Sequence, residues 1–183
     1  MKITFIILFV LALAAFGFMR YHQYQFEKSS QLKFNVMDFE LPGSKENLNK
    51  LILEWSSPES KEFVLDQLRI DYLFMSTLFP TILMLCLLVR RRLQESFFKS
   101  KTIPKYQILN YLLLGLAFLQ LFAWIFDIME NIRLSTWIKL GEVGNMFLFE
   151  TLVKLKFLFA ILGFLGPIAI CIWLKSTRKV KLR

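Results

Sequence analysis

YQILNYLLLGLAFLQLFAWIFDIMEN, residues 106–131, carries no charged side chain before Asp127. A helix needs about 20 consecutive, predominantly apolar residues to cross the hydrocarbon core of a bilayer. Residues 106–128 satisfy this length, and a soluble protein has no reason to maintain such a run. The stretch therefore predicts a transmembrane helix with one carboxylate near its end.

Three further blocks have similar length and composition. Hydrophobic residues make up 56% of the 183-residue chain, above the roughly 45–50% usual for soluble domains. We therefore predict an all-α integral membrane protein, a four-transmembrane-helix bundle with a small extracytoplasmic subdomain of helical and extended segments. In chain order the predicted segments are transmembrane helix 1–19, extracytoplasmic loop 20–70, transmembrane helix 71–92, cytoplasmic loop 93–105, transmembrane helix 106–128, extracytoplasmic loop 129–152, transmembrane helix 153–174 and cytoplasmic tail 175–183.

The basic residues predict the orientation of these segments. The net charge is +9, and the densest basic groups, residues 90–92 and 175–183, directly follow apolar blocks. Cytoplasmic loops carry the excess of Lys and Arg in membrane proteins. We therefore expect the protein in the inner (cell) membrane, with both termini and the loop 93–105 on the cytoplasmic side. Charge in this position meets lipid headgroups, and we expect no nucleic-acid partner.

The long hydrophilic region, residues 20–70, carries mixed charges, as a translocated segment does. Residues 31–36 alternate polar and apolar side chains, a strand-like period. Ser44 is a suitable N-cap for a short helix that ends near Trp55. Pro58 at the first position of a second helix predicts that this helix continues into the next span.

The first block, residues 1–19, has two interpretations. Its basic start, apolar run and small residues Ala12, Ala14 and Ala15 resemble a secretory signal peptide. The apolar run is longer than the 7–15 residues typical of such peptides, which favours an uncleaved signal anchor. Cleavage would leave three spans.

One face of the third span carries polar side chains. Gln120, Trp124, Asp127 and Asn131 are separated by four, three and four residues, so they lie on one side of a helix, with Glu130 beside them. A carboxylate within a span is costly in hydrocarbon and normally faces the bundle interior with a partner. This face is therefore predicted to point into the bundle.

Residues at the same depth of the neighbouring spans supply possible partners. Asp71 opens the second span, and Lys154 and Lys156 open the fourth. The predicted cluster consists of Asp71, Asp127, Glu130, Asn131, Lys154 and Lys156. It has a structural interpretation, an ion-pair and hydrogen-bond network, and a functional one, with Asp71, Asp127 and Glu130 as candidate catalytic groups and Gln120, Trp124, Asn131, Lys154 and Lys156 as candidate binding groups.

The sequence offers no pattern for a metal or a cofactor, and we expect neither. His22 is the only histidine, and Cys86 and Cys171 lie inside apolar blocks without ligand spacing. Gly163, Gly166 and Pro167 in the fourth span predict close helix packing and a possible bend.

Two short windows carry a resemblance. Phe126-Asp127-Ile128-Met129-Glu130-Asn131 resembles an FDxxEN signature of uncharacterised bacterial four-helix membrane proteins. The segment Leu68-Arg69-Ile70-Asp71-Tyr72-Leu73-Phe74 is also similar to that group. The resemblance implies the four-span fold and no particular activity.

Three functions follow from these patterns. The first is a binding or accessory component that contacts the lipid bilayer, with a membrane protein or a second copy of itself as the candidate partner. The second is an enzyme that uses Asp127, Glu130 and Asp71 on a lipid or amphiphile from the outer leaflet. The third is a small transporter or channel subunit, which needs a polar face through the whole membrane.

Overall fold

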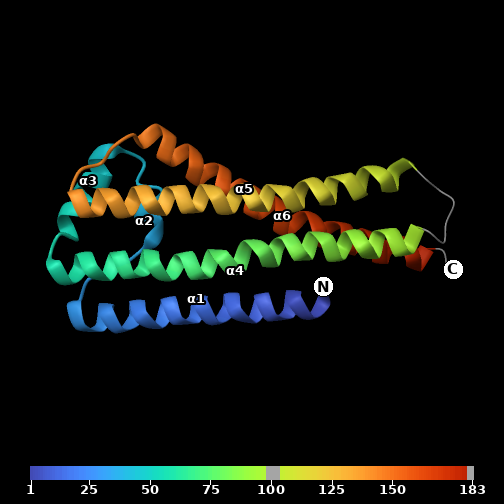
Figure 1. Ribbon diagram of the computed structural model, residues 1–183, viewed down its shortest axis with the longest axis horizontal. Coiled ribbons are helices and arrows are strands. Elements are labelled where there is room, and N and C mark those ends of the chain that lie inside the picture. The colour runs from blue at the N-terminus through green and yellow to red at the C-terminus, as the bar shows by residue number, and fades with distance from the viewer. Residues whose placement is uncertain (98–103, 181–183) are drawn as a thin grey trace.

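The computed structural model describes residues 1–97 and 104–180, and this part of the chain is all-helical (Figure 1). In chain order the helices are α1 (Lys2–Ser30), α2 (Val36–Glu40), α3 (Lys45–Glu54), α4 (Pro58–Phe97), α5 (Pro104–Leu140) and α6 (Met146–Val180). Helices α1, α4, α5 and α6 are long and apolar enough to cross a membrane. The protein is therefore a multi-pass helical membrane protein, as its sequence predicts.

Helix α4 is the centre of the bundle. It packs against α1, α5 and α6, and α5 packs against α6. Figure 1 shows α1 on the side of α4 away from α5, and α2 with α3 gathered at one end of the bundle. Helix α6 ends at the opposite end of the bundle.

The long helices exceed the thickness of a bilayer. Helix α4 has 40 residues, which at 1.5 Å per residue extend over about 60 Å, twice the roughly 30 Å of a hydrocarbon core. Asp71 and Arg90 are nineteen residues apart, or about 28 Å. Asp71 therefore lies about one hydrocarbon thickness from the basic group of residues 90–92. Lys99 and Lys101 of the predicted basic loop, and residues 181–183 of the predicted tail, lie outside the described residues.

The predicted helix starts in the hydrophilic region are confirmed. Ser44 caps α3, since its hydroxyl oxygen accepts a hydrogen bond from the Asn47 backbone nitrogen at 3.1 Å. Helix α4 begins at Pro58 and continues without interruption into the span, and the Ser57 hydroxyl accepts a hydrogen bond from the Ser60 backbone nitrogen. Local capping chemistry therefore fixes both starts.

The strand-like prediction for residues 31–36 is wrong. Residues 31–35 form an irregular connection, and no strand occurs in the described ranges. The backbone of Phe34 bonds to side chains of α1: its nitrogen donates to Glu27 Oε1 at 2.9 Å, and its oxygen accepts from Gln23 Nε2 at 2.7 Å. The alternating apolar residues pack on helices instead of pairing in a sheet.

The predicted loop 129–152 is mostly helical. Helix α5 continues to Leu140 and α6 begins at Met146, so the irregular connection is only residues 141–145. Gly141, with a φ of 74°, ends α5 by donating its backbone N–H to the Trp137 carbonyl at 2.8 Å. The mixed charges of this segment lie on helical surface and do not form a long loop.

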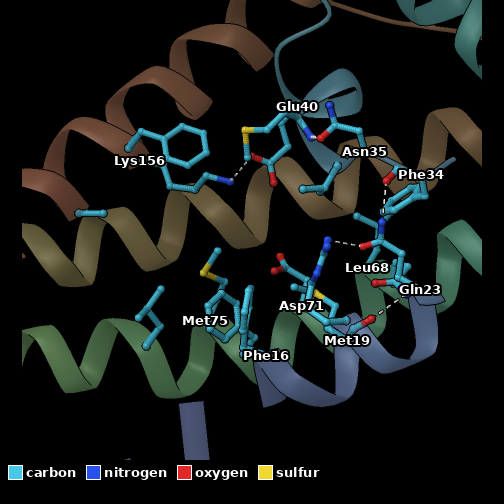
Figure 2. Close-up of a pocket in the computed structure, with 18 of the residues that line it drawn as sticks. Phe16, Met19, Gln23, Phe34, Asn35, Glu40, Leu68, Asp71, Met75 and Lys156 are labelled. Carbon is cyan, nitrogen blue, oxygen red and sulfur yellow. Dashed lines mark hydrogen bonds and ion pairs between the residues drawn. The ribbon is translucent and has the colours of Figure 1, made fainter. Parts of the chain in front are cut away.

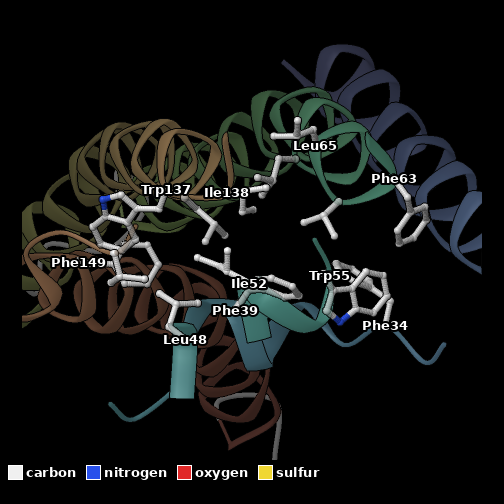
Figure 3. Close-up of a cluster of buried hydrophobic side chains, with 14 of the residues drawn as sticks. Phe34, Phe39, Leu48, Ile52, Trp55, Phe63, Leu65, Trp137, Ile138 and Phe149 are labelled. Carbon is white, nitrogen blue, oxygen red and sulfur yellow. The ribbon is translucent and has the colours of Figure 1, made fainter. Parts of the chain in front are cut away.

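An aromatic core holds the end of the bundle that carries α2 and α3. We use this name for Phe26, Phe34, Phe39, Trp55 and Phe63, all of which are buried. Figure 3 labels Phe34, Phe39, Trp55 and Phe63. The rings of Phe26 and Phe63 stack with centroids 3.9 Å apart, joining α1 to α4. Burial of aromatic side chains outside the predicted spans gives this end a folded core of its own. It fixes α2 over the bundle, which positions Glu40.

Candidate functional site

Lys156 of α6 is the centre of a buried ionic cluster. Its ammonium nitrogen lies 3.3 Å from Glu40 Oε2, 3.1 Å from Asp127 Oδ1 and 2.6 Å from Glu130 Oε2. The side chains of Lys156, Asp127 and Glu130 are fully buried. The ammonium donates hydrogen bonds to Glu40 and Asp127, and its contact with Glu130 is an ion pair. The cluster ties α2, α5 and α6 together.

Asp71 of α4 has no cationic partner in the described part of the chain. Its Oδ2 accepts a hydrogen bond from Asn131 Nδ2 at 2.7 Å, and the same amide group lies 3.5 Å from Asp127 Oδ2. The site therefore contains four carboxyl groups, those of Glu40, Asp71, Asp127 and Glu130, against the single ammonium of Lys156. With all of them ionised, its formal charge would be −3.

The predicted cluster is thus largely assembled, with one exception. Asp71, Asp127, Glu130, Asn131 and Lys156 meet, because the 120–131 face of α5 points inward as its spacing indicates.

Lys154 is outside this cluster. Its side chain is 64% exposed and pairs with Glu150 at 2.9 Å. Residues two apart on a helix point in nearly opposite directions. Lys154 and Lys156 therefore cannot both face the bundle interior.

Gln120 and Trp124 lie apart from the ionic cluster along α5. Gln120 is fully buried, and its Nε2 donates to the Phe159 carbonyl at 2.8 Å and the Leu116 carbonyl at 3.2 Å. It thus joins α5 to α6 about two turns from Asp127. Trp124 is half-buried.

Glu40 is the site residue that the sequence does not reveal. It follows Phe39 at the end of the five-residue helix α2 and is 4% exposed. Burial raises its pKa above the ordinary value of 4.5, the charge of Asp71 acts in the same direction, and that of Lys156 acts in the opposite one. No spacing rule points to it, because its position depends on how α2 folds over α6.

A cavity of about 400 Å³ adjoins the cluster (Figure 2). Its polar end includes Glu40, Asp71 and Lys156, and Figure 2 shows Phe16 and Met75 lying together in another part of it. The apolar side chains that α1, α4 and α6 contribute to the lining are Phe16, Met19, Leu68, Phe74, Met75, Leu78, Phe79, Phe157 and Ala160, and the segment that includes α2 adds Phe34, Val36 and Met37. A polar end with apolar walls is the usual composition of a site for a small organic ligand.

No family model, curated protein or solved structure matches the chain. The chemistry of the site is therefore inferred from its own residues. Of the three candidate catalytic carboxylates only Asp71 lines the cavity, whereas Asp127 and Glu130 do not. The arrangement can hold a ligand at Asp71 and Glu40, and it uses Asp127 and Glu130 to fix Lys156.

Proposed function

We propose that the protein is a binding component of the membrane that accommodates one amphiphilic molecule in this cavity, without chemistry of its own. The observation that carries the proposal is the cavity lining, charged at Asp71 and Glu40 and apolar along α1, α4 and α6. An amphiphile matches both parts of the cavity, because its hydrocarbon chain can pack against the apolar walls while its head group contacts the charged end.

The helix arrangement supports access from lipid. Helices α1 and α6 both contribute to the cavity wall, but the main contact of α1 is with α4. In the described part of the chain, no extensive contact between α1 and α6 closes the cavity on that side. Lys156 and Asp71 lie near the end of the spans opposite to the basic residues 90–92 and 175–183. Because basic residues favour the cytoplasmic side, the end with Lys156 and Asp71 is predicted to be the outer one. The proposed ligand therefore comes from the outer leaflet.

The two other functions have less support. Catalysis by the predicted carboxylates requires contact with a ligand, and Asp127 and Glu130 lie behind the cavity lining. Transport requires polar groups along the rest of the bundle. In the described residues that part holds apolar clusters around Leu113 and Leu116, and the hydroxyls of Thr77 and Thr81 bond to the backbone of their own helix.

Filling the apolar part of the cavity tests the proposal. Ala160→Phe places a ring among Phe16, Met75 and Leu78. We expect it to weaken saturable binding of a twelve-carbon amphiphile by about tenfold or more, because the side chain occupies the space of the ligand chain. The affinity is measured by equilibrium dialysis of the maltoside-solubilised protein. The radiolabelled probes are dodecyl amphiphiles with an ammonium, hydroxyl or sulfate head.

Ala14→Phe is the matched control, since Ala14 is exposed on α1. It should bind like the original protein. If no probe binds saturably to the original protein, or if Ala160→Phe and Ala14→Phe bind equally well, the cavity is not a ligand site and the proposal fails.

A further inference from the structure

We infer that the head group of the ligand is a protonated amine, bound by Asp71 and Glu40; the inference rests on the proposed function and specifies its ligand class. At its buried end the cavity presents the carboxylates of Asp71 and Glu40, and the only cation there among the described residues, Lys156, is already paired. An ammonium ion has three hydrogen-bond donors and no acceptor, which is the complement of such a surface.

Lys156 is not available to an anionic head group. Its ammonium already lies within 3.3 Å of oxygens of Glu40, Asp127 and Glu130. It donates hydrogen bonds to Glu40 and Asp127 and forms an ion pair with Glu130, so its charge is already compensated inside the protein. A phosphate or sulfate entering the cavity would have to displace one of these carboxylates and would meet the others at short range, which like charge disfavours.

Asp71 is the group with unused capacity. It is 7% exposed and lines the cavity. Its hydrogen-bond partner in the described part of the chain is the neutral amide of Asn131, on Oδ2, which leaves Oδ1 for a ligand. A buried carboxylate without a paired cation is strongly destabilising. A bound ammonium would supply the positive charge that Asp71 lacks.

The unsatisfied atoms of the cluster point to the same deficit. Asn131 Oδ1 and Glu130 Oε1 are buried and have no hydrogen-bond partner among the described residues. Both are acceptors, and neither residue lines the cavity, so the network behind Asp71 also has more acceptors than donors. No group of three or more His, Cys, Asp or Glu side chains in the described ranges is arranged to hold a metal ion. An organic ammonium bound at Asp71 Oδ1 would supply donors at the edge of this network.

Arg20 is the one further cation in the cavity lining, at the exposed surface of α1. Its guanidinium donates to Gln23 Oε1 at 2.7 Å, and among the described residues no ion pair joins Arg20 to Asp71 or Glu40. It leaves the excess of carboxylates at the buried end unchanged.

The test compares three probes with the same chain, dodecylammonium, dodecanol and dodecyl sulfate, at neutral pH. We expect dodecylammonium to bind the original protein about tenfold or more tightly than either other probe. Asp71→Asn should remove most of this preference by weakening dodecylammonium binding, with dodecanol binding unchanged. Asp66→Asn, which lies on the exposed face of α4 and pairs with Arg69, is the matched control and should bind like the original protein.

The outcomes separate the inference from the proposed function. If dodecanol or dodecyl sulfate binds as tightly as dodecylammonium, or if Asp71→Asn leaves dodecylammonium binding unchanged, the amine assignment is overturned while the cavity remains a site, provided that Ala160→Phe still blocks binding. If Ala160→Phe has no effect on any probe, the proposed function fails, and the amine assignment fails with it. Circular dichroism and the melting temperature of Asp71→Asn establish that the variant is folded.

Discussion

Lys156→Met should lower the free energy of unfolding by about 3–5 kcal/mol, the size of effect expected when one partner of a buried ion pair is removed. Methionine is about as long as lysine and fills similar space, so packing changes little. The substitution leaves Glu40, Asp127 and Glu130 around an apolar side chain, without the ammonium that lies within 3.3 Å of each. Unfolding in mixed micelles of maltoside and dodecyl sulfate measures the change.

Lys154→Met makes the matched control, because Lys154 is two residues away and its salt bridge with Glu150 is exposed. Exposed pairs contribute about 0–1 kcal/mol. Adding Glu130→Gln to Lys156→Met should restore part of the lost stability, because it removes one of the uncompensated carboxylates. Equal effects of Lys156→Met and Lys154→Met would contradict a buried network centred on Lys156.

Gly163→Ala should lower the free energy of unfolding by about 1–3 kcal/mol, the usual range for overpacking. A Cβ atom at Gly163 would overlap the side-chain amide of Gln120. Gln120 is fully buried and bonds to the Phe159 carbonyl, so it cannot move away without losing that hydrogen bond. The same unfolding measurement applies.

Gly115→Ala is the control for this substitution, because a Cβ atom at Gly115 would meet nothing within 4 Å. Alanine favours helix over glycine, so Gly115→Ala should be neutral or stabilising. Combined with Gln120→Ala, Gly163→Ala should cost much less than it does alone, which a double-mutant cycle detects. Additive effects of the two substitutions would show that Gly163 and Gln120 are not in contact.

The fold could be predicted from sequence because hydrocarbon imposes simple requirements. Long apolar runs such as residues 106–128 have few alternatives to a helix in a membrane. Ser44 and Pro58 marked helix starts through local chemistry. The strand prediction for residues 31–36 was wrong because alternating polar and apolar residues are not specific to a strand. An irregular segment that packs one side against α1 shows the same alternation.

The candidate site could be predicted only in part. Helical spacing along α5 placed Asp127, Glu130 and Asn131 on the buried face. Lys154 and Lys156 lie at nearly the same depth in the membrane, so their position along the sequence could not decide which of them faces the cluster. That depends on the rotation of α6 about its axis, which is set by packing. Glu40 could not be found, since its burial results from a tertiary contact between α2 and the bundle.

Photolabelling tests the central claim, that an amphiphile binds inside the cavity, most directly. The probe is dodecylammonium with a diazirine near the chain end, and mass spectrometry of the digested protein locates its attachment. We predict labelling concentrated on Phe16, on residues 74–79 and on Ala160, all of it blocked by unlabelled dodecylammonium and absent in Ala160→Phe. Labelling spread over the exposed apolar residues of α1 and α6, such as Ile3 and Phe164, with no competition, would contradict the claim.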